Sequence, residues 1–361
     1  IAMIKESQPH TVSTVRFQDI TVIVHGPVLD QAAPGAPQGM TLAAVQSVRK
    51  ILPGAKVVIS TWAGSAAEGL GADQVVYSED PGCLPYAPKE RPNNVNRQIV
   101  AMRAGLGLAD SRFVLKLRSD TILVSDGMIR QWGRFQVRNP HLRVFEQRVI
   151  TSAFLTYHPR VCFQGGRFTP FLFHVNDMIQ FGLAGDMRKL WVIPLMPTAD
   201  FTYFTAGELE GKVDKVANRR VPEDYIWTSA LTAAGFSSND SWADFRPELI
   251  PVSELSIVNN FHLLDQTDMG FLCLKYPEFA RNHHLIDTPY FTSEEWLTLY
   301  GLYCDPSAPR PPRPARLTRA RIKDALRSLM QVHRLGAYLK RASRPARHRV
   351  KEALRGLRLW K

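Results

Sequence analysis

An acidic residue stands directly after an apolar run in the segment 113–122, FVLKLRSDTI. In open α/β sheets, ligands bind beyond the carboxyl ends of the strands, so Arg118, Ser119 and Asp120 are expected where a ligand can reach them. A carboxylate offers the hard oxygen atoms that Mg²⁺ or Mn²⁺ prefers, and Lys116 or Arg118 can neutralise a diphosphate. The alternative is that Asp120 only caps the turn after the strand.

Amide side chains and an arginine gather in the segment 93–99, NNVNRQI, ahead of that strand. We expect a helix over residues 93–109, with Asn94, Asn96 and Arg97 hydrogen-bonding a nucleotide or a sugar. The competing interpretation is that an asparagine is the helix N-cap and Arg97 a surface charge. Three amides and an arginine within five residues exceed what a cap requires, which favours a binding role.

The segment 222–227, PEDYIW, has the composition of a helix start. Proline is favoured in the first turn of a helix, and acidic residues there interact favourably with the helix dipole. One interpretation is that these acids do nothing more than complement the helix dipole. Alternatively, Glu223 or Asp224 is the general base that accepts a proton from an attacking hydroxyl group.

Apolar strands and helices alternate before Asp120. Strands are expected at 20–25, 55–62 and 74–77, and a helix at 41–52. This alternation predicts an α/β fold with a Rossmann-like, mixed but mostly parallel sheet.

Four residues directly at strand ends are expected at the same edge of the sheet as Asp120. Gly26 and Pro27 follow the first strand, and Thr61 and Trp62 close the second. A glycine lets the backbone approach a ligand closely. Trp62 can stack on a nucleotide base, although a buried tryptophan is equally consistent with the sequence.

Two common nucleotide-binding motifs are absent from the sequence. No GxGxxG follows the first strand, so we expect neither NAD nor flavin, and no GxxxxGK[ST] occurs, which argues against a P-loop NTPase. Such a sheet often belongs to a transferase that uses nucleotide-sugars.

The positive charge of the chain is concentrated at its end. Residues 310–361 hold 17 of the 45 Lys and Arg but only Asp324 and Glu352, a net charge of +15. The other 309 residues carry 28 basic and 31 acidic side chains, a net charge of −3. The basic balance therefore belongs to a tail and not to the body of the protein.

This tail follows a proline-rich segment, 306–314, which predicts a semi-rigid spacer. Beyond it, apolar residues recur at helical spacing among the basic ones: Ile322, Leu326, Leu329, Met330, Val350, Leu354 and Leu357. Basic amphipathic helices bind anionic membrane surfaces, which is the partner we expect. Nucleic-acid binding and a disordered, solvated tail are the alternatives.

Neither a bilayer span nor a disulfide framework is expected from the sequence. No apolar run approaches the roughly 18–20 residues that cross a bilayer. The four cysteines, Cys83, Cys162, Cys273 and Cys304, are scattered and form no CxxC pair. This usage predicts a reducing cytoplasm and no structural zinc.

Several short motifs, in this order, resemble the WavE lipopolysaccharide-synthesis family over roughly residues 20–290. They are Gly26-Pro27, Ser60-Thr61-Trp62, Asp80-Pro81-Gly82, the segments 93–99 and 116–120, Phe173 to Asp177, Phe181-Gly182, Asp186-Met187 and the segment 222–227. Together they are more specific than any one motif.

The resemblance implies a glycosyltransferase of GT-A type in the assembly of bacterial surface polysaccharide. It implies a nucleotide-sugar donor and a lipid-linked or core oligosaccharide acceptor, with Asp177 and Asp186 in the sugar or acceptor pocket. Ser119 and Asp120 would stand at the DxD-like motif that binds Mn²⁺ or Mg²⁺. Arg118 replaces its first acid, so only one acidic ligand remains.

His262 is the candidate that would complete the metal shell around Asp120. A hydrogen-bonded histidine on a strand is the alternative. Among the acids of the segment 222–227, the resemblance favours Glu223 or Asp224 as general base, which implies direct displacement with inversion.

The expected organisation has four parts: an N-terminal extension at 1–17, a GT-A-like domain at 18–305, a linker at 306–316 and a basic amphipathic tail at 317–361. We expect the protein at the cytoplasmic face of the inner membrane, beside a lipid-bound acceptor. Two other functions fit the sequence: a sugar nucleotidyltransferase, and a non-catalytic glycan-binding or assembly protein with a degenerate transferase fold.

Overall fold

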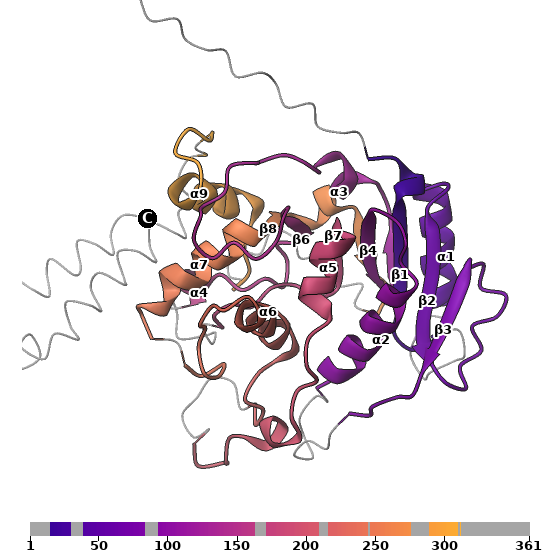
Figure 1. Ribbon diagram of the computed structural model, residues 1–361, viewed down its shortest axis with the longest axis horizontal. Coiled ribbons are helices and arrows are strands. Elements are labelled where there is room, and N and C mark those ends of the chain that lie inside the picture. Colours follow the sequence, from indigo (N-terminus) through magenta and orange to yellow (C-terminus); the bar gives the residue numbers. More distant parts are fainter. Residues whose placement is uncertain are drawn as a thin grey trace, which may run out of the picture.

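A seven-stranded mixed sheet with the order β3-β2-β1-β4-β7-β6-β8 lies at the centre of the protein (Figure 1). The strands are β1 (Ile20–His25), β2 (Lys56–Trp62), β3 (Gln74–Ser78), β4 (Phe113–Arg118), β6 (Val149–Ser152), β7 (Ile179–Leu183) and β8 (Phe261–Leu264). Only β7 runs antiparallel to its neighbours. The predicted mixed, mostly parallel α/β sheet is confirmed.

The computed structural model describes residues 15–29, 39–83, 93–162, 171–208, 216–244, 246–275, 289–309 and 311. The predicted tail at 317–361 and most of the N-terminal extension lie outside the described residues. Within them, no helix combines the length and the apolar character needed to cross a membrane.

Helices cover both faces of the sheet. They are α1 (Met40–Ile51), α2 (Val95–Gly107), α3 (Gly127–Arg130), α4 (Pro159–Cys162), α5 (Ala184–Trp191), α6 (Pro222–Ala233), α7 (Leu249–Asn260), α8 (Gln266–Met269) and α9 (Ser293–Tyr303), with short 3-10 turns η1 (Phe17–Asp19) and η2 (Thr198–Thr202). A separate two-stranded sheet pairs β5 (Thr121–Leu123) with β9 (Phe271–Cys273). The helices expected at 41–52 and 93–109 correspond to α1 and α2.

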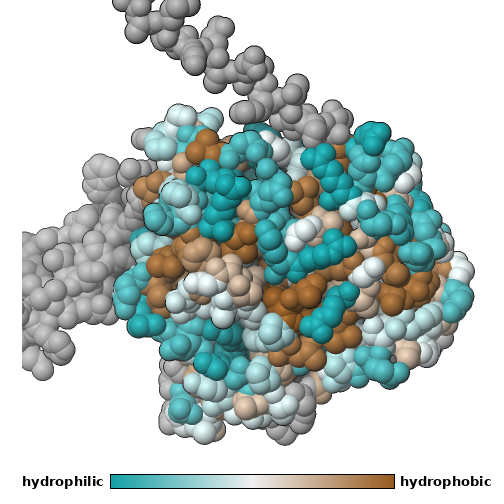
Figure 2. Space-filling model, in the orientation of Figure 1, coloured by the Kyte–Doolittle hydropathy of each residue, from teal (hydrophilic) through white to brown (hydrophobic). Residues whose placement is uncertain are grey.

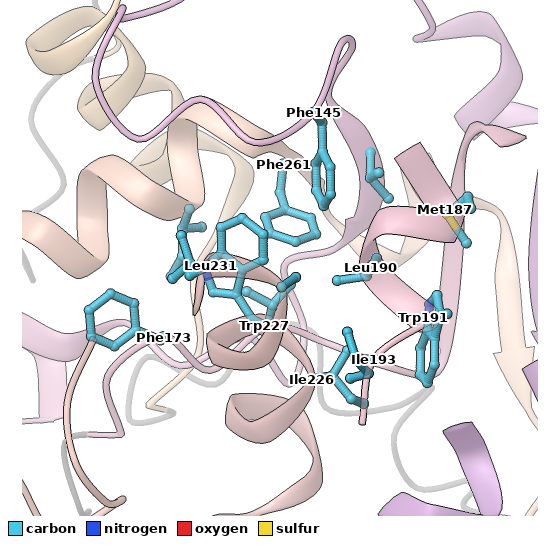
Figure 3. Packing of buried hydrophobic residues seen from close by; sticks show 14 of the residues in the cluster. Phe145, Phe173, Met187, Leu190, Trp191, Ile193, Ile226, Trp227, Leu231 and Phe261 are labelled. Carbon is cyan, nitrogen blue, oxygen red and sulfur yellow. The ribbon is translucent and has the colours of Figure 1, made fainter. Parts of the chain in front are cut away.

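Two apolar cores lie on opposite faces of the sheet. One packs α1 against β1, β2 and β4, and the other packs α2, α5, α6, α7 and α9 against the second face. In the second core, Trp227 of α6 lies 4.8 Å from Phe261 and 5.4 Å from Phe145, measured between ring centroids (Figure 3). This core anchors α5 and α6 beside the strand ends.

The direction of β7 defines the two edges of the sheet. Leu117 of β4 is opposite Ile179 of β7, and Phe113 is opposite Leu183. We call the side where β1, β2 and β4 end the carboxyl edge, and the other side the amino edge. β7 therefore begins at the carboxyl edge and ends at the amino edge.

Helix α2 lies unusually close to β1 at one glycine. A Cβ atom on Gly105 would come within 2.5 Å of the Cγ2 atom of Ile23, which is fully buried. Gly107, in the same helix, has no neighbouring atom within 4 Å of such a Cβ. The missing side chain at Gly105 therefore lets the last turn of α2 pack directly against β1.

We expect Gly105→Ala to lower the free energy of unfolding by about 1–3 kcal/mol, because the core must shift to admit the methyl group. Gly107→Ala is the matched control in the same helix, and it should change stability by less than about 0.5 kcal/mol. Urea denaturation of both variants measures the difference. Equal stability of the two would show that α2 is not held at this contact.

Candidate functional site

Charged side chains from three separate segments converge at the carboxyl edge. Arg118 and Asp120 follow β4, Asp177 precedes β7, and Glu223 lies in the first turn of α6. The charges of all four act on the pKa of Lys116 in β4. The structure therefore brings residues more than 100 positions apart in the sequence into one electrostatic cluster.

Asp120 forms a two-point ion pair with Arg118. The Nε atom of Arg118 is 3.1 Å from Oδ1, and its second guanidinium nitrogen is 2.5 Å from Oδ2. The Asp120 side chain is buried, whereas that of Arg118 remains 24% exposed. The cation at this strand end thus reaches solvent while its counter-ion is held beneath the surface.

The described residues alone do not form a site for Mn²⁺ or Mg²⁺. Both Asp120 oxygens are already paired with Arg118, and no three His, Cys, Asp or Glu side chains within the described ranges are grouped to hold a metal ion. His262 is on β8, separated from β4 by two strands, with its ring against Phe135 and Trp296. The structure does not bring His262 and Asp120 together.

Lys116 is a fully buried cation within the sheet. Its Nζ atom donates hydrogen bonds to the Gln98 Oε1 atom at 3.2 Å and to the backbone carbonyl of Asp177, and it lies 4.3 Å from the ring centroid of Trp191. Burial lowers the pKa of Lys116 to about 7. Lys116 therefore holds Gln98 and the backbone of Asp177 in place beneath the site, and its ammonium is not open to a ligand.

Gln98 is a site residue that the sequence interpretation missed. Its Nε2 atom donates to the Asp177 carboxylate, and its Oε1 atom accepts from Lys116. Gln98 is buried, whereas the neighbouring Arg97 is partly exposed. The helical spacing of the amide-rich segment could have identified Gln98, because the adjacent side chains Arg97 and Gln98 cannot both face the sheet.

The three polar residues predicted on this helix use their side chains within the protein. Asn94 is the exposed N-cap of α2, and Asn96 hydrogen-bonds both the N–H (2.7 Å) and the carbonyl (3.1 Å) of Met196. Arg97 forms an ion pair with Asp80, at 2.6 Å and 2.7 Å. They lie at the carboxyl edge and brace the loops there.

The turn after β1 lies against the turn after β4. Gly26 has a φ of +120°, and a Cβ at this position would be 3.1 Å from the Ser119 hydroxyl oxygen. The N–H of Ser119 donates to the His25 carbonyl at 3.0 Å. Pro27 is exposed, Thr61 is buried and Trp62 is partly exposed. Gly26 thus lies against Ser119, beside Asp120, whereas Thr61 and Trp62 end β2, which is separated from β4 by β1.

Glu223 and Asp224 occupy different environments. The Glu223 side chain is 26% exposed, with its Oε2 atom 3.7 Å from the Nε2 atom of His174. Asp224 is fully buried, with Oδ2 3.3 Å from Arg220. Burial raises the pKa of Asp224 to about 7, and burial together with the nearby Asp177 raises that of Glu223 to about 8.

The sequence matches the WavE lipopolysaccharide synthesis family over residues 20–332. The chain belongs to this family. The resemblance seen in the short motifs is therefore confirmed. No curated protein matches the sequence.

Several solved structures are similar to this WavE protein. The galactosyltransferase LgtC with donor and acceptor sugar analogs has 13% identity and a TM-score of 0.30, covering 61% of this chain and 73% of that chain. An active-site mutant of LgtC has 14% identity and a TM-score of 0.27, covering 47% of this chain and 59% of that one. Mouse xyloside xylosyltransferase 1, in its apo form, has 10% identity and a TM-score of 0.36, covering 76% and 94%.

Asp186 of the WavE protein lies at the amino edge, away from Asp177. It follows the end of β7, and its two carboxylate oxygens accept the N–H groups of Glu146 at 2.7 Å and Gln147 at 2.9 Å. The structure thus separates the two acids that were expected to share one pocket. Asp186 holds the loop before β6.

The raised pKa of Glu223 predicts a pH-dependent stability. The folded WavE protein keeps this proton up to about pH 8, whereas an unfolded chain loses it near 4.5. Because the folded state binds more protons in this interval, stability should fall as the pH rises from 4.5 to 8. Glu223→Gln should flatten that decline in urea denaturation series. The exposed Glu79→Gln is the control, and equal slopes for both variants would contradict the assignment.

Proposed function

We propose that this WavE protein is a glycosyltransferase of GT-A type. It moves a sugar from a nucleotide-sugar donor to a lipid-linked or core oligosaccharide during synthesis of lipopolysaccharide or another surface polysaccharide. The observation that carries the proposal is the meeting of a partly exposed arginine, Arg118, and a partly exposed carboxylate, Glu223, at the carboxyl edge, where α/β sheets bind ligands.

On the donor side, Arg118 is the group that faces the leaving diphosphate. Its guanidinium can form paired hydrogen bonds with phosphate oxygens, and Asp120 keeps it oriented from below. The glycine turn at Gly26 leaves room for a ligand to approach Ser119. These residues stabilise charge that develops on the leaving group.

A divalent ion would add positive charge at the diphosphate. Both oxygens of Asp120 already accept hydrogen bonds from Arg118, so the proposed chemistry assigns the charge stabilisation to Arg118. Ligand binding that requires Mn²⁺ would show that residues beyond this pair complete a metal site.

On the acceptor side, Glu223 is the proposed general base. A pKa of about 8 gives its carboxylate a high affinity for the proton of an attacking hydroxyl, and the side chain reaches the surface. One base acting on the acceptor implies direct displacement with inversion at the transferred sugar. Asp224, fully buried against Arg220, holds the first turn of α6 in place.

We place the enzyme on the cytoplasmic face of the inner membrane, where its acceptor is bound to lipid. The basic segment 310–361, with a net charge of +15, supports contact with an anionic surface. Its predicted helices lie outside the described residues.

Loss of the Arg118–Asp120 pair should abolish transfer. We expect Asp120→Asn to reduce kcat by at least about 100-fold, because the arginine loses the partner that orients it toward the phosphates. Asp126→Asn, which removes a carboxylate paired with exposed Arg130, is the matched control and should retain activity. A folded Asp120→Asn protein with normal turnover would contradict the proposed role of the Arg118–Asp120 pair.

The two neighbouring acids of α6 should respond differently to neutralisation. Glu223→Gln should lower kcat by about 100- to 10,000-fold without lowering the free energy of unfolding, as expected for loss of a general base. Asp224→Asn should lower the free energy of unfolding by about 1.5–3 kcal/mol, because Arg220 keeps a weaker partner in this buried pair. Steady-state kinetics and urea denaturation separate the two effects. A larger kcat loss in Asp224→Asn would reverse the roles.

The decisive experiment is a thermal-shift screen of UDP, GDP, dTDP and CMP sugars, with and without Mn²⁺, because a ligand of the native state raises Tm. The stabilising donor is then incubated with oligosaccharide acceptors. Release of nucleotide together with sugar transfer supports the proposal. Pyrophosphate release would identify a nucleotidyltransferase, and binding without turnover a glycan-binding protein.

A further inference from the structure

The loop before β6 is rich in arginine. Residues 133–148, here called the arginine loop, contain Arg134, Arg138, Arg143 and Arg148 but only one acid, Glu146. The first 309 residues as a whole have a net charge of −3, so this loop opposes the charge of the body that carries it.

None of the four arginines forms an ion pair with any carboxylate that the structure describes. Arginines elsewhere do so, among them Arg16, Arg49, Arg97, Arg118, Arg130, Arg160, Arg219, Arg220 and Arg246. In the arginine loop, Arg148 donates instead to the carbonyls of Val258, Phe135 and Val137. Uncharged oxygen atoms orient these cations without neutralising them.

The positive charges of the loop act on one another. Burial, together with the nearby guanidinium groups of Arg148 and Arg143, lowers the pKa of Arg138 to about 9. Arg134 and Arg143 are exposed. Anionic groups that approach this surface therefore relieve repulsion already present in the folded protein.

The loop is held in a fixed shape. Asn259 and Asn260, at the end of α7, hydrogen-bond the loop backbone through the amides of both side chains, for example from Asn259 Nδ2 to the His141 carbonyl at 2.8 Å. Phe135 and Leu142 adopt positive φ values of 58° and 54°. Such conformations are unfavourable for residues other than glycine and persist only where the surroundings enforce them.

The arginine loop lies at the amino edge, beside the end of α9. The Asn139 Nδ2 atom donates to the Tyr303 carbonyl at 2.8 Å, and Figure 1 shows the loop crossing the molecule next to α9. Hydrophilic residues gather over this part of the face in Figure 2. The basic segment of the sequence begins at Arg310, seven residues after Tyr303, a span of at most roughly 25 Å.

Exposed aliphatic side chains accompany the charges. Val137, within the loop, is 48% exposed, and Leu302 of α9 is 53% exposed. Cations mixed with apolar side chains are the composition of surfaces that rest at a lipid headgroup region.

We propose that the arginine loop binds the phosphate headgroups of an anionic bilayer, on the same side of the protein as the start of its basic C-terminal segment. Exposed Arg134 and Arg143 make the contacts, because a planar guanidinium pairs with phosphate oxygens through two hydrogen bonds. Buried Arg148 holds the loop in shape. The bilayer contact is a property of the folded body and is independent of the proposed transferase chemistry.

The test compares full-length proteins in co-sedimentation with vesicles of phosphatidylcholine containing phosphatidylglycerol. We expect the double variant Arg134→Gln/Arg143→Gln to bind about 25-fold more weakly, about fivefold per basic residue at the surface. The control, Arg219→Gln/Arg246→Gln, makes the same charge change at two ion-paired arginines in the segments before and after α6 and should bind like the wild type. The C-terminal segment is present in every protein and contributes equally.

Three results would overturn the proposal: unchanged binding of the loop variant, equal losses in loop variant and control, or equal binding of the wild type to pure phosphatidylcholine vesicles. Displacement from vesicles by millimolar inorganic phosphate, at constant ionic strength, would assign the loop to a soluble phosphate ligand and not to a bilayer. Thermal unfolding at the wild-type Tm shows that the loop variant is folded.

Discussion

A lysine ammonium enclosed by the sheet is the constraint on which the carboxyl edge depends. Burying such a charge costs several kcal/mol unless polar groups compensate for its lost hydration. Here Gln98 of α2, the carbonyl of Asp177 and the ring of Trp191 in α5 surround Lys116. Two helices and the start of β7 are therefore fixed against β4, and the same register places Arg118 and Asp120 at the carboxyl edge.

The acids around this lysine differ in their surroundings, and this difference separates those that stabilise the fold from the one proposed to act in the reaction. Asp224 and Asp120 are buried and each has an arginine partner. Glu223 has no arginine or lysine ion-pair partner among the described residues. Its neighbour His174 has a pKa lowered to about 4 by burial and is therefore neutral at physiological pH. A carboxylate that lacks a fixed cation and reaches the surface is the one that can exchange a proton.

The sequence predicted the sheet well, because buried strands and helices alternate with little ambiguity between 20 and 120. It also placed Asp120 and Glu223 correctly at a strand end and in a helix first turn. It did not reveal that Arg118 pairs with both oxygens of Asp120. An ion pair between side chains two residues apart leaves no periodic pattern in the sequence. The antiparallel direction of β7, which places Asp177 and not Asp186 at the carboxyl edge, depends on tertiary pairing and was equally hidden.

The sequence also gave no reason to single out the arginine loop, whose significance comes from the absence of acids around it within the described fold. Its position has a geometric consequence. The loop and the proposed catalytic residues lie at opposite edges, separated by the six residues of β4, or roughly 20 Å at about 3.3 Å per residue. If the loop rests on a bilayer, Glu223 is held above the membrane surface by the length of the sheet. Only a saccharide long enough to span that distance from its lipid anchor can then present a hydroxyl group to Glu223.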